Sequence, residues 1–99
     1  MPFEIETGPK AINELIGILN WYAEQQEDLP RMFRVQYEKD VSTILQNPEI
    51  YPQFRRGYRQ ALMQTFPYFI IYSINKKEGN IFIISIFHTS RHPRKKFSK

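Results

Sequence analysis

Cysteine is absent from the 99 residues, so the chain can form neither a disulfide framework nor a thiolate metal site. With two histidines and no cysteine, a zinc site is not expected, and the sequence indicates no cofactor. The apolar runs are far shorter than the about 20 residues that a membrane helix needs. Residues 1–6 carry acids in place of the apolar segment of a secretory signal. We therefore expect a cytoplasmic protein that contacts no membrane.

Standard enzyme motifs are also lacking. The sequence contains no P-loop, no GxSxG, no HExxH and no dinucleotide fingerprint. The residues alone therefore indicate no common class of enzyme.

Acidic residues are scarce in the second half of the chain. Residues 1–49 hold nine acids and four bases, a net charge of −5, whereas residues 50–99 hold one acid and ten bases, a net charge of +9. A half this basic attracts a polyanion or an acidic partner. The alternative is a lysine-rich surface that only keeps the protein soluble.

The length of 99 residues predicts one domain, because two domains would need a longer chain. Hydrophobic residues make up 41% of the chain and aromatic residues 15%, which is too much for a disordered protein. Residues 91–99 contain Pro93, five bases and no acid. We predict a single domain over residues 1–99 in which residues 91–99 form an irregular basic tail.

Hydrophobic periodicity predicts a strand and two helices in the first half. Residues 3–7 alternate apolar and acidic side chains, which indicates a short, half-buried strand. Asp28 is predicted to cap the second helix with its carboxylate, and Pro48 to end it. The short gap between the helices predicts an antiparallel hairpin. The two apolar stripes at helical spacing are Ala11, Leu15, Ile18, Leu19 and Tyr22, then Phe33, Tyr37, Val41, Ile44 and Leu45.

The second half predicts three strands, at residues 58–64, 66–75 and 80–89, with a turn at 76–79. Consecutive strands joined by short turns are antiparallel, and the helical hairpin must cover one face of their sheet. We therefore predict an α+β fold of order β-α-α-β-β-β, with an N-terminal strand and an antiparallel helical hairpin packed on a small antiparallel sheet.

Basic side chains lie at both ends of this predicted sheet, where arginine suits phosphate or carboxylate because its planar fork donates two parallel hydrogen bonds. In a three-stranded meander, the start of the first strand and the end of the third strand lie at opposite ends of the sheet. The sequence therefore does not predict that these basic residues form one compact site. Alternatively, these arginines pair with Glu24, Glu27, Asp40 or Glu49 of the helices. The basic set is Arg55, Arg56 and Arg59 on one side, and His88, Arg91, Arg94, Lys95 and Lys96 on the other.

Trp21 and Tyr22 end the first helix, and their spacing predicts that both pack in the core or at its rim. A buried position predicts that Trp21→Ala weakens or unfolds the protein.

Four segments in this order resemble the ParE side of the RelE/ParE toxins. They are NPEIYP (47–52), Arg59-x-Ala61-Leu62, FPYFIIY (66–72) and FHTSRHP (87–93), and the Trp21-Tyr22 pair is typical of the same group. The resemblance covers nearly the whole chain. It implies the toxin of a type II toxin–antitoxin pair, which inhibits growth by poisoning DNA gyrase and is neutralised by a small acidic antitoxin. The target-binding residues would be Arg59, His88, Arg91, Arg94 and Lys95.

The related nuclease branch, which cleaves mRNA in the ribosome, is the alternative. Members of that branch typically carry the motif Gly-Tyr-Arg-x-x-Tyr on the middle strand, and Phe69 stands here in place of its arginine. Ala61 occupies the place of a second basic residue on the preceding strand. The tyrosine or histidine that follows the last strand in that branch is matched only loosely by His88, and Lys95 lies near the tyrosine position. If the chain is a nuclease, Arg59, His88 and Arg91 are its catalytic residues; otherwise none is assigned. An inactive, partner-binding relative is a second alternative.

Overall fold

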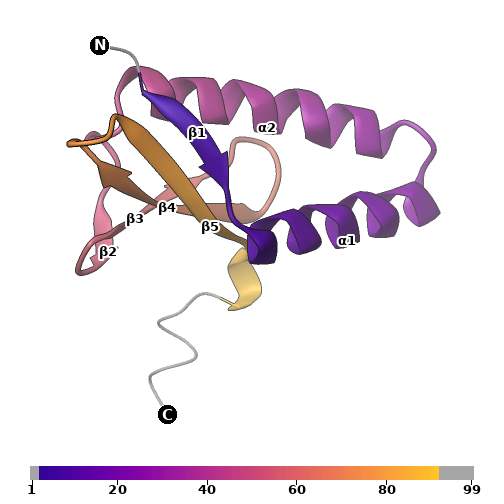
Figure 1. Cartoon of the computed structure of the whole chain (residues 1–99). Coiled ribbons are helices and arrows are strands. Elements are labelled where there is room, and N and C mark those ends of the chain that lie inside the picture. Colours follow the sequence, from indigo (N-terminus) through magenta and orange to yellow (C-terminus); the bar gives the residue numbers. More distant parts are fainter. Residues whose placement is uncertain (1–2, 92–99) are drawn as a thin grey trace.

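A computed structural model describes residues 3–91 of the chain (Figure 1). The elements are β1 (Glu4–Thr7), α1 (Pro9–Gln25), α2 (Leu29–Gln46), β2 (Gln53–Arg55), β3 (Tyr58–Leu62), β4 (Tyr68–Asn75), β5 (Asn80–His88) and the 3-10 turn η1 (Thr89–Arg91). The predicted α+β order is confirmed. Residues 92–99 of the predicted basic tail lie outside the described residues. No helix in the described part is long and apolar enough to cross a membrane.

The five strands form one sheet in the order β1-β5-β4-β3-β2. Strands β3, β4 and β5 make the predicted antiparallel meander, and β1 pairs with β5 in parallel, from Glu4 opposite Asn80 to Thr7 opposite Ile83. The edge strand β2 was not predicted, because three residues with one apolar side chain give no readable period. Its turn into β3 uses Gly57 at φ 82°, a conformation that suits glycine.

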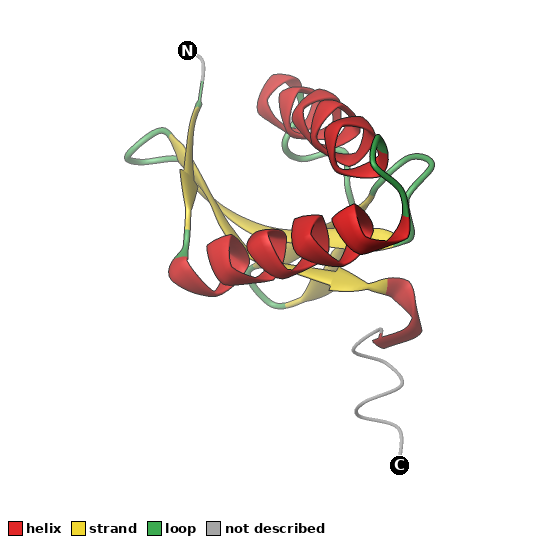
Figure 2. Cartoon of the chain, turned by 90° about the vertical axis from the view of Figure 1, so that its right-hand side faces the viewer, coloured by secondary structure: helices red, strands yellow, loops and turns green. Residues whose placement is uncertain are grey.

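The two helices lie on one side of the sheet (Figure 2). Pro9 fits the first turn of α1, where its missing N–H would have no partner, and α2 ends two residues before Pro48. The cap predicted at Asp28 is wrong in one respect. Its carboxylate makes no capping hydrogen bond, because it pairs with the Arg31 guanidinium at 2.9 Å.

The core fills the space between the hairpin and the sheet. Burial of each large apolar side chain contributes about 1.5–3 kcal/mol. Tyr22 is buried as predicted, but Trp21 is 55% exposed, so the prediction of a buried tryptophan is wrong. The helices contribute Ala11, Tyr22, Phe33 and Ile44, and the sheet contributes Ala61, Met63, Tyr68, Ile70, Tyr72, Ile81, Ile83 and Ile86.

Candidate functional site

The predicted site residues lie at opposite ends of the sheet. Arg59 on β3 pairs in register with Tyr72, whereas His88 at the end of β5 pairs with Tyr68. Four residues along a strand correspond to about 13 Å. Arg91 ends η1, and Arg94 and Lys95 lie outside the described residues. Arg59 and His88 therefore belong to two separate surfaces.

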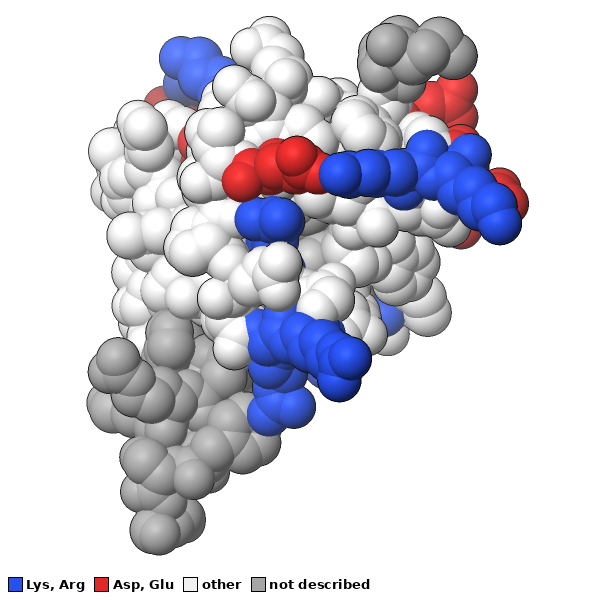
Figure 3. All heavy atoms as spheres, turned by 90° about the vertical axis from the view of Figure 1, so that its left-hand side faces the viewer, with Lys and Arg blue, Asp and Glu red and all other residues white. Residues whose placement is uncertain are grey.

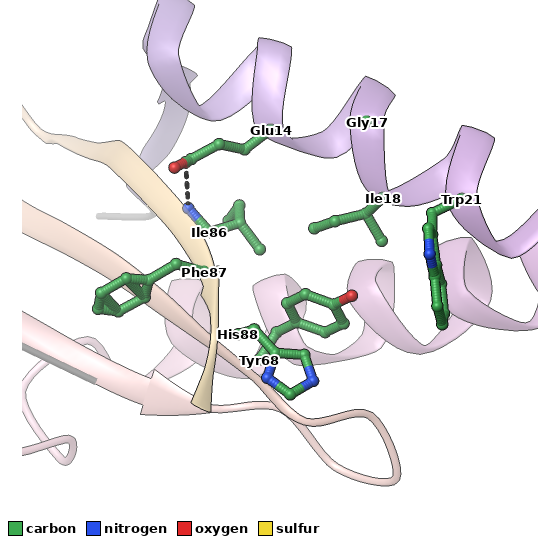
Figure 4. A pocket seen from close by; sticks show the side chains of 8 residues that line it. All are labelled: Glu14, Gly17, Ile18, Trp21, Tyr68, Ile86, Phe87 and His88. Atoms are coloured by element: carbon green, nitrogen blue, oxygen red, sulfur yellow. Dashed lines mark hydrogen bonds between the residues drawn. The ribbon is translucent and has the colours of Figure 1, made fainter. Parts of the chain in front are cut away.

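The first surface, here called the aromatic hollow, lies between α1 and the end of β5 (Figure 4). It consists of two overlapping hollows of about 280 and 480 Å³. Ile18 of α1 and Tyr68 and His88 of the sheet line the gap, and Trp21 stands at one end of it. The full lining is Glu14, Gly17, Ile18, Trp21, Tyr22, Pro67, Tyr68, Ile86, Phe87 and His88.

The edge of β5 forms one wall of the aromatic hollow. Strand β1 pairs with β5 only as far as Ile83, where the Gly8 N–H donates the last main-chain bond to the Ile83 carbonyl. Beyond that point the Glu14 carboxylate takes over, accepting from the Ile86 N–H at 2.8 Å and from the Ser85 hydroxyl at 3.0 Å. The Ile86 N–H points away from β4, so it lies on the edge of β5 that β1 covers further back. This edge continues from Ile86 to His88. No strand within residues 3–91 pairs with that stretch.

Gly17 leaves room in the wall formed by α1. A Cβ atom at this position would meet nothing within 4 Å. Glycine inside a helix is about 0.8–1.0 kcal/mol less favourable than alanine. The helix therefore has a residue of low helix propensity, Gly17, where it faces the aromatic hollow.

His88 is held by its neighbours in the chain. Its Nδ1 accepts a hydrogen bond from the Ser90 backbone N–H at 3.1 Å and lies 2.9 Å from the Ser90 hydroxyl. The ring meets Tyr68 edge-on, with centroids 5.2 Å apart. These contacts engage Nδ1, so Nε2 is the ring nitrogen left for a partner in the hollow.

The second surface, here called the basic hollow, lies at the other end of the sheet and has a volume of about 380 Å³. Its charged side chains are Arg59, Lys76 and Glu49. The Arg59 Nη1 donates to the carbonyl oxygens of Tyr51 at 2.7 Å and of Glu49 at 3.2 Å. Both acceptors are main-chain carbonyls, so these bonds do not form the ion pair with a carboxylate of the helices that was the alternative for Arg59. The full lining is Glu49, Gln53, Gly57, Arg59, Ile74 and Lys76.

Tyr72 also holds the loop between α2 and β2 whose carbonyls accept from Arg59. The Tyr72 hydroxyl donates to the Pro48 carbonyl at 2.6 Å. Burial raises the pKa of this phenol to about 12, so it stays a donor at physiological pH. Lys76 pairs with Glu49, and this hydrogen-bonded cation lowers the pKa of the Glu49 carboxyl.

No group of three or more histidine, aspartate or glutamate side chains that could hold an ion occurs in the described range, residues 3–91.

Comparison with solved structures identifies the fold of the chain first. The structure is similar to a chain from the "Chromosomal ParDE TA system from P. aeruginosa", with a TM-score of 0.75 and 17% sequence identity. The match covers 87% of this chain and 95% of that chain. An identity this low shows the shared fold alone.

The family follows from the sequence model. The family described as "ParE toxin of type II toxin-antitoxin system, parDE" matches residues 5–93. The chain therefore belongs to the ParE toxin family, as the resemblance indicated. No curated protein matches the sequence.

Sequence reasoning missed four residues that build these surfaces. Glu14 and Gly17 looked like ordinary residues of an amphipathic helix, because nothing local shows that they face the edge of β5. Lys76 looked like a turn residue. Trp21 carried a signal, since it lies one residue from Tyr22 and the two cannot both face the same core.

Proposed function

We propose that this chain inhibits growth by acting on DNA gyrase, and that a small acidic antitoxin neutralises it. The coarser role, a toxin of the ParE family, is shown by the match over residues 5–93. The observation that carries the finer proposal is the separation of the residues that a nuclease would need. Arg59 and His88 lie on different strands with about 13 Å of strand length between their positions. A ribonuclease needs its base, acid and cations around one phosphate.

The middle of the sheet supports the same choice. Phe69 stands where the nuclease branch has arginine, and it packs edge-on against Phe87 with centroids 6.2 Å apart. Such an aromatic pair offers no positive charge to a phosphorane. His88 adds a further argument, because its Nδ1 accepts from the Ser90 backbone N–H and is not free to take the proton of a 2′-hydroxyl.

The antitoxin, in this proposal, adds an extended segment to the open edge of β5. The Ile86 carbonyl and the main-chain groups of His88 provide hydrogen bonds, since the Ile86 N–H is already bonded to Glu14. Trp21 and Ile18 provide apolar contacts on the helix side. Gly17 leaves the space that such a segment occupies. The net charge of +9 on the second half of the chain favours an acidic partner.

The target-binding residues are proposed to be Arg59, His88, Arg91, Arg94 and Lys95. Arg91→Ala tests this set in a growth assay beside a thermal melt. We expect the variant to lose toxicity while keeping its melting temperature and its binding to the antitoxin. A fully toxic, normally stable variant would remove Arg91 from the set. An equal loss of stability and toxicity would make Arg91 a structural residue.

A purified-component assay tests the target. The chain is added to gyrase with supercoiled plasmid, and in parallel to translating ribosomes with a defined mRNA. We expect trapped, cleaved plasmid and intact mRNA, and the plasmid cleavage should disappear when the antitoxin is added first. Cleaved mRNA with unaffected gyrase would establish the ribosome-dependent endoribonuclease instead. No effect in either assay, together with normal growth on expression, would indicate an inactive partner-binding module.

A further inference from the structure

Arg59 is a fixed guanidinium whose hydrogen bonds do not neutralise it. Both of its acceptors are main-chain carbonyls, those of Glu49 and Tyr51. Carbonyl oxygens orient the planar fork but carry no full negative charge. Within residues 3–91, these bonds engage only Nη1, which leaves the Nε and Nη2 donors for another acceptor. The result is an arginine already positioned for an anion.

A further cation lines the same hollow, and another lies at the turn beside it. Lys76 lines it from the end of β4, with 72% of its side chain exposed, and Arg56 is exposed at the neighbouring turn between β2 and β3. Gly57 of this turn lines the hollow, and a Cβ atom there would meet nothing within 4 Å. In Figure 3, Lys and Arg side chains run across the middle and lower part of this face, with one acidic group among them and others at the right-hand edge.

Glu49 is the single carboxylate among the described residues that line the basic hollow. It pairs with Lys76 and also feels the charge of Arg59. Its side chain is 49% exposed, so an incoming anion can displace it from Lys76. The hollow therefore carries a net positive charge that one internal acid only partly offsets.

We propose that the basic hollow binds a phosphodiester group of nucleic acid, with Arg59 as the oriented donor and Lys76 and Arg56 as flanking cations. The aromatic hollow offers an open strand edge and apolar side chains, which suit a protein segment. The basic hollow offers fixed cations on a polar surface, which suit phosphate. We assign the phosphate to duplex DNA; this choice of source rests on the proposed function, because gyrase acts on DNA.

The test measures binding of the full chain to a labelled DNA duplex by fluorescence anisotropy at several salt concentrations. Each phosphate contact contributes about 0.9 to the slope of log affinity against log salt. We expect Lys76→Gln and Arg56→Gln each to weaken binding and to reduce that slope by about 0.9. Glu49→Gln should act in the opposite direction and tighten binding, because it removes the only acid of the hollow. Arg59→Lys should weaken binding and leave the slope unchanged, since it keeps the charge but loses the fork.

Arg34→Gln is the matched control. Arg34 is exposed on α2, about 18 Å along the helix axis from Gln46 at 1.5 Å per residue, and its removal lowers the net charge equally. We expect DNA binding of this variant to equal that of the wild type within twofold. If Arg34→Gln loses as much affinity as Lys76→Gln, the binding is a nonspecific effect of net charge and the proposal fails.

Two further arms separate the source of the phosphate and the proposed function. An RNA duplex of the same length that binds tighter than DNA would overturn the assignment to DNA. Variants that bind DNA normally but lose the antitoxin would make the hollow a protein site and overturn the proposal. Variants that lose DNA binding while wild-type protein leaves gyrase unaffected would uphold the hollow and reject only the gyrase target.

Discussion

The two ends of the sheet differ in what they offer a partner. The end formed by β5 and α1 carries Trp21, Tyr68 and His88 around an open strand edge. The end formed by β2, β3, the end of β4 and the loop before β2 carries Arg59 and Lys76 around a polar hollow. One surface suits apolar and main-chain contacts, and the other suits an anion. Under the proposals above, the antitoxin segment binds at the aromatic hollow and a phosphate group binds at the basic hollow.

The largest effect is expected beneath the aromatic hollow. Tyr22 is 8% exposed and packs against Phe33, Phe66 and Tyr68. We expect Tyr22→Ala to lower the free energy of unfolding by about 3–5 kcal/mol, as for other large buried aromatics. Denaturant unfolding measures it. A loss below about 1 kcal/mol would show that this end is not supported by the core.

Glu14→Ala tests the boundary between the closed and open parts of the β5 edge. The substitution leaves the Ile86 N–H without its carboxylate and removes the ion pair with Lys10. An unsatisfied, part-buried donor costs about 1–3 kcal/mol, and we expect a loss in this range. Lys10→Ala is the control, since the exposed ion pair alone contributes about 0–1 kcal/mol. Equal losses for the two variants would contradict the role given to the Ile86 bond.

Tyr72→Phe tests the loop at the basic end. Loss of the hydrogen bond to the Pro48 carbonyl should reduce stability at pH 7 by about 0.5–1.5 kcal/mol. Because burial raises the pKa of the Tyr72 phenol to about 12, its contribution is complete below pH 10 and is lost as pH rises through 12.

The alkaline limb gives the control for this prediction. The pKa of Tyr37 is also raised to about 12 by burial, so the wild type should unfold progressively between pH 10 and 12. Tyr72→Phe should make the stability curve shallower in that window, as should Tyr37→Phe. Identical curves for wild type and Tyr72→Phe above pH 10 would show that Tyr72 ionises as freely in the folded chain as in the unfolded one.

Gly17→Ala should act in opposite directions on folding and on binding. Alanine is about 0.8–1.0 kcal/mol better than glycine inside a helix, and no atom lies within 4 Å of the added methyl group. We expect a gain in stability up to that amount, with weaker binding of the antitoxin because the hollow narrows. A variant that is stabilised and binds the antitoxin normally would remove the segment from this hollow.

Trp21→Ala should have the smallest effect on stability. Since 55% of Trp21 is exposed, we expect a loss below about 1 kcal/mol, far from the value for a buried tryptophan. A thermal melt against Tyr22→Ala checks this directly. A loss as large as that of Tyr22→Ala would return Trp21 to the core.

The fold was largely predictable from the sequence, because strong periodicity marks α1, α2, β4 and β5. The parallel pairing of β1 with β5 was not, because strand order depends on contacts between segments about 75 residues apart. Strand β2 was missed because it is too short to show a period. The candidate residues Arg59 and His88 were found by their chemistry. Their partners, Lys76 and Glu14, were missed because only the assembled sheet brings them to the two hollows.

The most direct test of two separate surfaces is a paired titration of Trp21→Ala and Lys76→Gln. Each variant is titrated by fluorescence anisotropy with the labelled antitoxin and with a labelled DNA duplex. We expect Trp21→Ala to lose at least about tenfold in antitoxin affinity, as a buried aromatic anchor does, and to bind DNA normally. Lys76→Gln should bind the antitoxin normally and DNA more weakly. A variant that loses both ligands while remaining folded would contradict the separation.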